Sequence, residues 1–210
     1  MTRAPQCRRS ADDMKNGIVI LLAILLAGCS REIEQTGKQG ITVMPGRGIP
    51  GLCELGMSVS EVRRKNPSSI HGNYRECGVR TVLLPTLGAT IGITNDDQTV
   101  DGMYFHVTSF DNPAPMRMRL DRPFRGKLGT SVSFLGQPVT ANAIMEAFGM
   151  PAVVWTNPPA PSLEIIDRAL AAGSLYMKHP TMDLLVYYHQ GVSFNIVSNN
   201  VREFGVMRAR

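Results

Sequence analysis

The sequence has no apolar run long enough to cross a membrane. The apolar run from Ile18 to Ala27 is roughly half of the ~20 residues that a spanning helix needs. It follows a positively charged start and ends in small residues, and these are the parts of a secretory signal peptide. We therefore expect a signal peptide over residues 1–28, and Met14 is a more typical start for it than Met1.

Patterns that carry catalysis or bind metal are also lacking. "GTSVS" and "GMSVS" lack the final glycine of a nucleophile elbow, and neither has an acid and a histidine in credible order. "NDDQTVDG" does not have the register of a calcium loop. The histidines show no i, i+4 pair, which is the helical zinc spacing; they are His71, His106, His179 and His189. The sequence predicts no enzyme, no metal site and no cofactor.

Charge is only mildly positive, with a formal net charge of +5. This balance is not typical of a nucleic-acid-binding protein, so no nucleic-acid partner is predicted. A local basic stretch contains Arg117, Arg119, Arg122, Arg125 and Lys127. We interpret it as a solvated linker, and the alternative is a contact with acidic lipid or another polyanion.

Cysteines are few, and only Cys53 and Cys77 follow Cys29. An oxidising compartment permits these two to pair. Such a bridge would contribute ~3 kcal/mol by constraining the unfolded chain. The alternatives are two separate buried thiols or a metal pair, and the metal pair is weakly supported because no His or Cys lies nearby at zinc-like spacing.

The chain contains an internal repeat. "LGMSVSEV" at 55–62 aligns with "LGQPVTAN" at 135–142, and "GATIGIT" at 88–94 aligns with "GVSFNIV" at 191–197. Apolar and polar residues alternate in the second pair of segments, which is typical of half-buried antiparallel strands. Each half therefore reads as a short helix followed by three strands.

Local signals support these elements. Ser58 and Glu61 have capping-box spacing, and the helix that they begin should end before Pro67. Thr140 is the expected cap of the corresponding helix in the second half. The Ser198-Asn199 turn suits a hairpin, because Asn tolerates left-handed backbone.

The predicted fold class is α+β: two tandem repeats, each a short helix or helix pair packed on a three-stranded antiparallel meander. A polar stretch rich in Gly and Gln precedes them and predicts a flexible tether. The predicted divisions are a tether over 29–50, a first repeat over 51–110, a basic linker over 111–130, and a second repeat over 131–210 with a helical insertion over 155–180.

Leu26-Ala27-Gly28-Cys29 resembles the bacterial lipobox at all four positions. The resemblance implies that Cys29 carries diacylglycerol on its sulfur, becomes the mature N-terminus and receives an N-acyl lipid. Multiple acyl chains give stable anchoring. Ser30 rather than aspartate follows, and by resemblance to Gram-negative lipoproteins this implies an outer-membrane anchor that faces the periplasm.

Leu55-Gly56-Met57-Ser58 followed by Glu61-Val62 resembles the repeat of small bacterial lipoproteins of the SmpA/OmlA (BamE) type and the tandem repeats of β-lactamase inhibitor protein. The two repeats that carry the resemblance together cover most of residues 48–208. It implies a non-catalytic adaptor or binding module. The second half departs from the pattern at Gln137-Pro138, and no binding residue is carried over.

Aromatic side chains are the predicted partner-binding residues, with core packing as the alternative: Tyr104, Trp155, Tyr187 and Tyr188. The expected function is that of a membrane-anchored periplasmic lipoprotein that docks another envelope protein. The second expectation is an inhibitor or a ligand-binding sensor that uses a concave sheet face, and the third is a hydrolase.

Overall fold

The computed structural model describes residues 40–74, 79–94, 98–108, 122–156 and 161–210. The predicted signal peptide, the predicted lipidation site Cys29 and Cys77 lie outside these residues, and so do Arg117 and Arg119. The folded unit runs from Ile41 to Arg210. None of its described helices is both long enough and apolar enough to cross a membrane.

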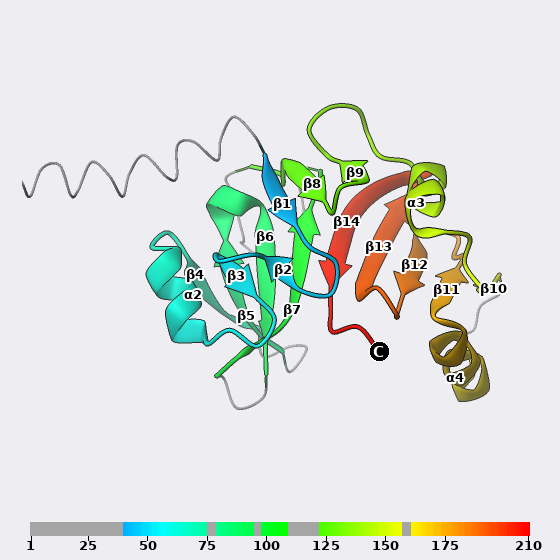
Figure 1. The fold of residues 1–210 in the computed structure, drawn as a ribbon, viewed down its shortest axis with the longest axis horizontal. Helices are drawn as coiled ribbons and strands as arrows, with labels where there is room; N and C mark the ends of the chain where they lie inside the picture. The colour runs from blue at the N-terminus through cyan, green and yellow to red at the C-terminus, as the bar shows by residue number, and fades with distance from the viewer. Residues whose placement is uncertain (1–39, 75–78, 95–97, 109–121, 157–160) are drawn as a thin grey trace, which may run out of the picture. The chain divides into compact units, whose positions relative to one another are not determined.

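Short strands dominate the folded unit, with few helices (Figure 1). In chain order the elements are β1 (Ile41–Val43), β2 (Gly48–Ile49), β3 (Cys53–Glu54), α2 (Val59–Lys65), β4 (Ile70–Tyr74), β5 (Val79–Leu84), the 3-10 helix η2 (Pro85–Leu87), β6 (Ala89–Ile93), β7 (Val100–His106), β8 (Gly126–Leu128), β9 (Val132–Ser133), α3 (Ala141–Phe148), β10 (Val153–Trp155), α4 (Leu163–Ala172), β11 (Ser174–Met177), β12 (Asp183–Tyr187), β13 (Val192–Val197) and β14 (Asn200–Val206).

A nine-stranded sheet forms the centre of the fold, in the order β10-β11-β12-β13-β14-β7-β6-β5-β4. Adjacent strands in this sheet are antiparallel, except β10 and β11, which run parallel. Strands β7 and β14 join the two halves, with Phe105 opposite Phe204 and Tyr104 opposite Gly205. The last strand in the chain therefore lies in the middle of the sheet.

The predicted fold class, two tandem helix-on-meander repeats, is wrong. Strands β6 and β13 lie where the alternation placed them, but each meander ends in an edge strand with unpaired backbone groups, and those two edges pair with each other. One hydrophobic core then runs under both halves, from Val62 in α2 to Phe194 in β13. Among the described residues, the second half adds only a small separate cluster of Val153, Ala169 and Leu175.

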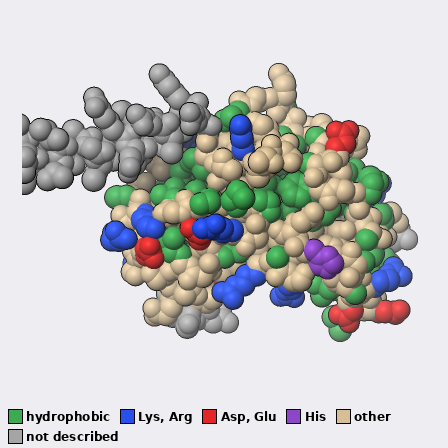
Figure 2. Space-filling view, viewed as in Figure 1, with side chains coloured by type: hydrophobic (Ala, Val, Ile, Leu, Met, Phe, Trp, Pro, Cys, Tyr) green, Lys and Arg blue, Asp and Glu red, His purple; other side chains and the backbone are tan. Residues whose placement is uncertain are grey.

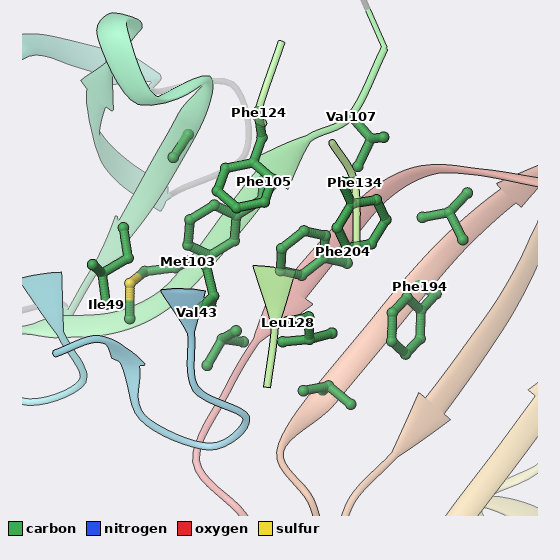
Figure 3. Packing of buried hydrophobic residues seen from close by; sticks show 14 of the residues in the cluster. Val43, Ile49, Met103, Phe105, Val107, Phe124, Leu128, Phe134, Phe194 and Phe204 are labelled. Atoms are coloured by element: carbon green, nitrogen blue, oxygen red, sulfur yellow. The ribbon is translucent and has the colours of Figure 1, made fainter. Parts of the chain in front are cut away.

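The core lies on one face of the sheet, here called the core face. Strands β1–β3, β8 and β9 cover it together with α2 and α3 (Figure 1). At its centre the Phe204 ring stacks between Phe105 and Phe134, at centroid distances of 4.7 and 4.9 Å (Figure 3). Phe124 meets the Phe105 and Phe204 rings edge-on. Burying each such side chain contributes about 1.5–3 kcal/mol.

Parts of the predicted tether and basic linker belong to this core. From Ile41 onward the predicted tether forms β1 and β2, and Val43 is fully buried. Strand β1 pairs in parallel with β8, which lies inside the predicted linker. Phe124, next to the basic residues, is also fully buried. The short β1 has no alternating pattern, so its pairing with β8 had no local signal.

The predicted helical insertion extends the sheet. Helix α4 connects the parallel strands β10 and β11 and packs Ala169 against Val153 and Leu175. Leu163, at the start of α4, is 78 % exposed, because α4 approaches the sheet through its small residue, Ala169.

The predicted caps and one predicted turn are confirmed. The Ser58 hydroxyl accepts a hydrogen bond from the Glu61 amide, and Thr140 caps α3 in the same way. The Glu61 carboxylate contacts Lys65 at 3.0 Å. Between β13 and β14, Ser198 and Asn199 have left-handed backbone with φ of 49° and 63°.

Candidate functional site

The sheet face opposite the core face, here called the second face, carries a groove of about 530 Å³. The groove crosses the junction of β7 and β14 and extends to β6 and β13. Its lining residues are Gly92, Ile93, Thr94, Asp101, Gly102, Tyr104, Ser193, Gly205, Val206 and Met207. It is therefore built from both halves of the chain.

Glycines form the floor of the groove. Gly92 lies opposite Gly102 in the β6–β7 pair, and Gly205 lies opposite Tyr104 in the β7–β14 pair. A Cβ atom added to Gly92 or Gly102 would approach only backbone atoms, the nearest at 3.8 and 3.6 Å, so both positions have room for a side chain. The groove exists because these strand positions carry none.

Tyr104 forms one wall of the groove. Its side chain is 46 % exposed. The ring lies over Gly205, because a Cβ atom at Gly205 would be 3.3 Å from the Tyr104 Cε1 atom. A larger residue at position 205 would displace the ring. The glycine thus sets the position of the exposed aromatic wall.

A β-bulge places a carboxylate at the groove. Gly92 pairs with Gly102 and Ile93 pairs with Val100, which leaves Asp101 as the extra residue of β7. Bulges re-aim side chains in this way. Asp101 is exposed and lines the groove, and no lysine, arginine or histidine is among the groove's described lining residues.

A chain of polar side chains crosses the second face beside the groove. Thr90 Oγ1 and His106 Nε2 are 2.9 Å apart, and His106 Nδ1 lies 2.8 Å from Glu203 Oε2. Asn195 Nδ2 donates to Glu203 Oε1 at 2.8 Å. The four residues come from β6, β7, β14 and β13, so their contacts tie together the four strands that form the groove.

The order of hydroxyl, imidazole and carboxylate is that of a catalytic triad. Thr90, however, lies inside β6, opposite Leu83 on one side and Tyr104 on the other. Backbone amides in such a strand point into the neighbouring strands, so they cannot serve as the donors that an oxyanion needs. The arrangement favours a structural role for this row of polar side chains.

The predicted aromatic residues do not lie together. Only Tyr104 reaches the groove. Trp155 and Tyr188 are half-buried and pack beside the small cluster under α4. Tyr187 is 2 % exposed, and its hydroxyl donates to the Gly149 carbonyl at 2.6 Å. Three of the four therefore pack against the fold, which was the alternative to partner binding.

Only parts of this site could be recognised from the sequence. His106 was noted as one of four scattered histidines, but its contact with Glu203 was missed, because that contact depends on the pairing of β7 with β14. A glycine inside a strand can mark a place where another segment approaches the backbone closely. Nothing local showed that Gly92, Gly102 and Gly205 would adjoin one another.

Cys53 is fully buried, and burial raises the pKa of its thiol to about 12. Because Cys77 lies outside the described residues, the pairing of these two cysteines stays a prediction. Across the described ranges, no three His, Cys, Asp or Glu side chains are placed to hold a metal ion.

The buried Cys53 thiol should make the reduced protein less stable in alkali. The folded state retains the proton up to about pH 12, whereas the unfolded thiol ionises above its ordinary value of 9.0. The thiol's contribution is therefore complete below pH 9.0 and is lost as the pH rises from there toward 12. Between about pH 9 and about pH 10, the wild type should lose ~1 kcal/mol more stability than Cys53→Ala. Urea unfolding under reducing conditions measures this difference, and parallel pH dependence of the two proteins would contradict it.

The chain matches no protein-family model, no curated protein and no solved structure. The function is therefore inferred from the sequence and from the geometry of the groove.

Proposed function

We propose that the protein is a membrane-anchored periplasmic lipoprotein that binds another envelope protein through the groove on the second face, without catalysing a reaction. The observation that carries the binding role is Tyr104, an exposed aromatic side chain at the wall of a glycine-floored groove. Exposed aromatic residues commonly anchor protein partners. A floor of glycine backbone lets a partner segment approach the sheet closely.

A ligand-binding sensor is the second candidate, because a groove of about 530 Å³ falls in the size range of small-molecule sites. Such sites are lined mainly by apolar and aromatic side chains. In the part of the lining that the structure describes, Tyr104 is the one aromatic residue, and glycine, serine, threonine and aspartate make up most of the rest. This lining favours an extended protein segment over a compact apolar ligand.

The proposal of a lipid anchor is supported by the lipobox-like sequence Leu26-Ala27-Gly28-Cys29. Cys29→Ala should remove the site of lipid attachment, so the lipid mass should be lost and the protein should no longer be retained by a lipid anchor in the membrane fraction. Mass spectrometry and membrane fractionation measure both results. Cys53→Ala is the matched control and should stay lipidated. An unchanged mass and fractionation of Cys29→Ala would show that this cysteine is not the anchor.

Partner binding is tested by a photo-reactive amino acid placed at position 104 in living cells. We expect one discrete cross-linked protein, and none from the same group at Leu163, which is exposed on α4. Gly92→Leu should abolish the cross-link, because the new side chain fills the groove without meeting a close atom. Gly136→Leu is its control, since Gly136 has open space and lies outside the groove. A cross-link that survives Gly92→Leu would rule out the groove.

A further inference from the structure

The charge of the groove is opposite to that of the whole chain. The chain has a formal net charge of +5, and Lys and Arg side chains are spread over the face that carries β1–β3 (Figure 2). Among the described residues that line the groove, Asp101 is the one group charged at neutral pH. This contrast indicates that the groove is complementary to a cation.

The Asp101 carboxylate is available to a partner. It is exposed on the bulge of β7, and no described residue forms a salt bridge with it. Glu203, the nearest comparable carboxylate in the polar chain, already contacts His106 and accepts from Asn195. Of these two acids, Asp101 is therefore the one that an incoming cation would meet in the groove.

Tyr104 adds a second attraction for the same kind of group. A cation over the face of an aromatic ring is attracted by the ring's electron density, and the planar guanidinium of arginine also stacks on such a ring. Tyr104 and Asp101 come from the same strand, three positions apart, and both line the groove. Beside them, the bare backbone of Gly92 and Gly102 leaves room for an aliphatic stem.

From these features we infer that the groove binds an arginine side chain of the partner protein. Its guanidinium lies over the Tyr104 ring and pairs with the Asp101 carboxylate, and its stem lies along the glycine floor. The inference rests on the proposed partner-binding role and names the chemistry that the partner must present. Arginine suits the site better than lysine because an ammonium group does not stack.

The test titrates the full chain, in detergent micelles and labelled with ¹⁵N-glycine, with the peptide acetyl-Gly-Gly-Arg-Gly-Gly-amide. We expect saturable shifts of the Gly92, Gly102 and Gly205 amide signals. The same peptide with citrulline, which has the shape of arginine without its charge, should bind at least about fivefold more weakly. Equal binding of the two peptides, or no saturable shift with the arginine peptide, would overturn the inference.

Substitutions test which residues of the groove bind the arginine side chain. Asp101→Asn keeps the size of the side chain and removes its charge, and it should weaken the arginine peptide by about fivefold or more. Tyr104→Leu should weaken it by a similar factor through loss of the ring. Asp167→Asn, on the exposed side of α4, is the control and should leave binding unchanged. Unchanged binding in Asp101→Asn would contradict the assignment.

The two proposals fail in different ways. A cross-link at position 104 that Gly92→Leu abolishes, combined with no preference for arginine over citrulline, would leave the partner-binding role standing and overturn the arginine inference. Arginine-specific shifts without any cross-link in cells would support recognition of arginine and contradict the envelope partner.

Discussion

Phe204→Ala is expected to lower the free energy of unfolding by about 3–5 kcal/mol. Phe204 is fully buried in β14, and its ring stacks between Phe105 of β7 and Phe134, which follows β9. Truncation removes the middle ring of this stack, so the cavity opens where the two halves of the sheet join. Urea unfolding followed by circular dichroism measures the loss.

Two variants control this prediction. Leu163→Ala removes a side chain that is 78 % exposed and should change stability by less than about 0.5 kcal/mol. Phe204→Leu keeps an apolar side chain in the core and should cost less than the alanine variant. A loss below about 1.5 kcal/mol for Phe204→Ala would show that the β7–β14 junction is not held mainly by this stack.

Gly126→Ala is expected to destabilise the protein by about 2–3 kcal/mol, because the added methyl group overpacks a closed contact. A Cβ atom at Gly126 would overlap the Ile41 carbonyl oxygen, which is backbone and cannot rotate away, and would press on the Phe124 ring. Because Ile41 pairs with Gly126, β1 should separate from β8. Hydrogen exchange of the β1 amides, together with urea unfolding, measures both effects.

Gly136→Ala is the control for the Gly126 variant. A Cβ atom at Gly136 meets nothing within 4 Å, so this variant should stay within about 0.5 kcal/mol of the wild type. Retained protection of the β1 amides in Gly126→Ala would contradict the predicted separation. A stable protein with an unprotected β1 would show instead that β1 contributes little to stability.

Local features of this fold could be predicted from the sequence. Alternation placed the strand that contains Ala89 and Ile91, and hydroxyl residues placed the caps at Ser58 and Thr140. Each of these signals depends on residues within a few positions of one another. The structure agrees with them because tertiary packing at these positions reinforces the local preference.

Long-range pairing could not be predicted in this way. The contact between Phe105 and Phe204 joins strands on different halves, and no turn sequence connects them. The expectation of two separate repeats followed from treating each edge strand as an end. The groove was missed for the same reason, because Gly205 adjoins Tyr104 only through this pairing.

The central position of β14 has a consequence for how the chain folds. Met103 and Val206 are far apart in the sequence but are neighbours in the sheet. Strand β1 likewise pairs with β8, which comes much later in the chain. Contacts so distant along the chain require a large loop to close first, which slows folding. Until β14 arrives, β7 exposes an edge that a second molecule's β14 would fit equally well. At high concentration, partly folded molecules should therefore exchange their C-terminal strands. The resulting dimers would be held together by the same contacts that β14 makes within the monomer.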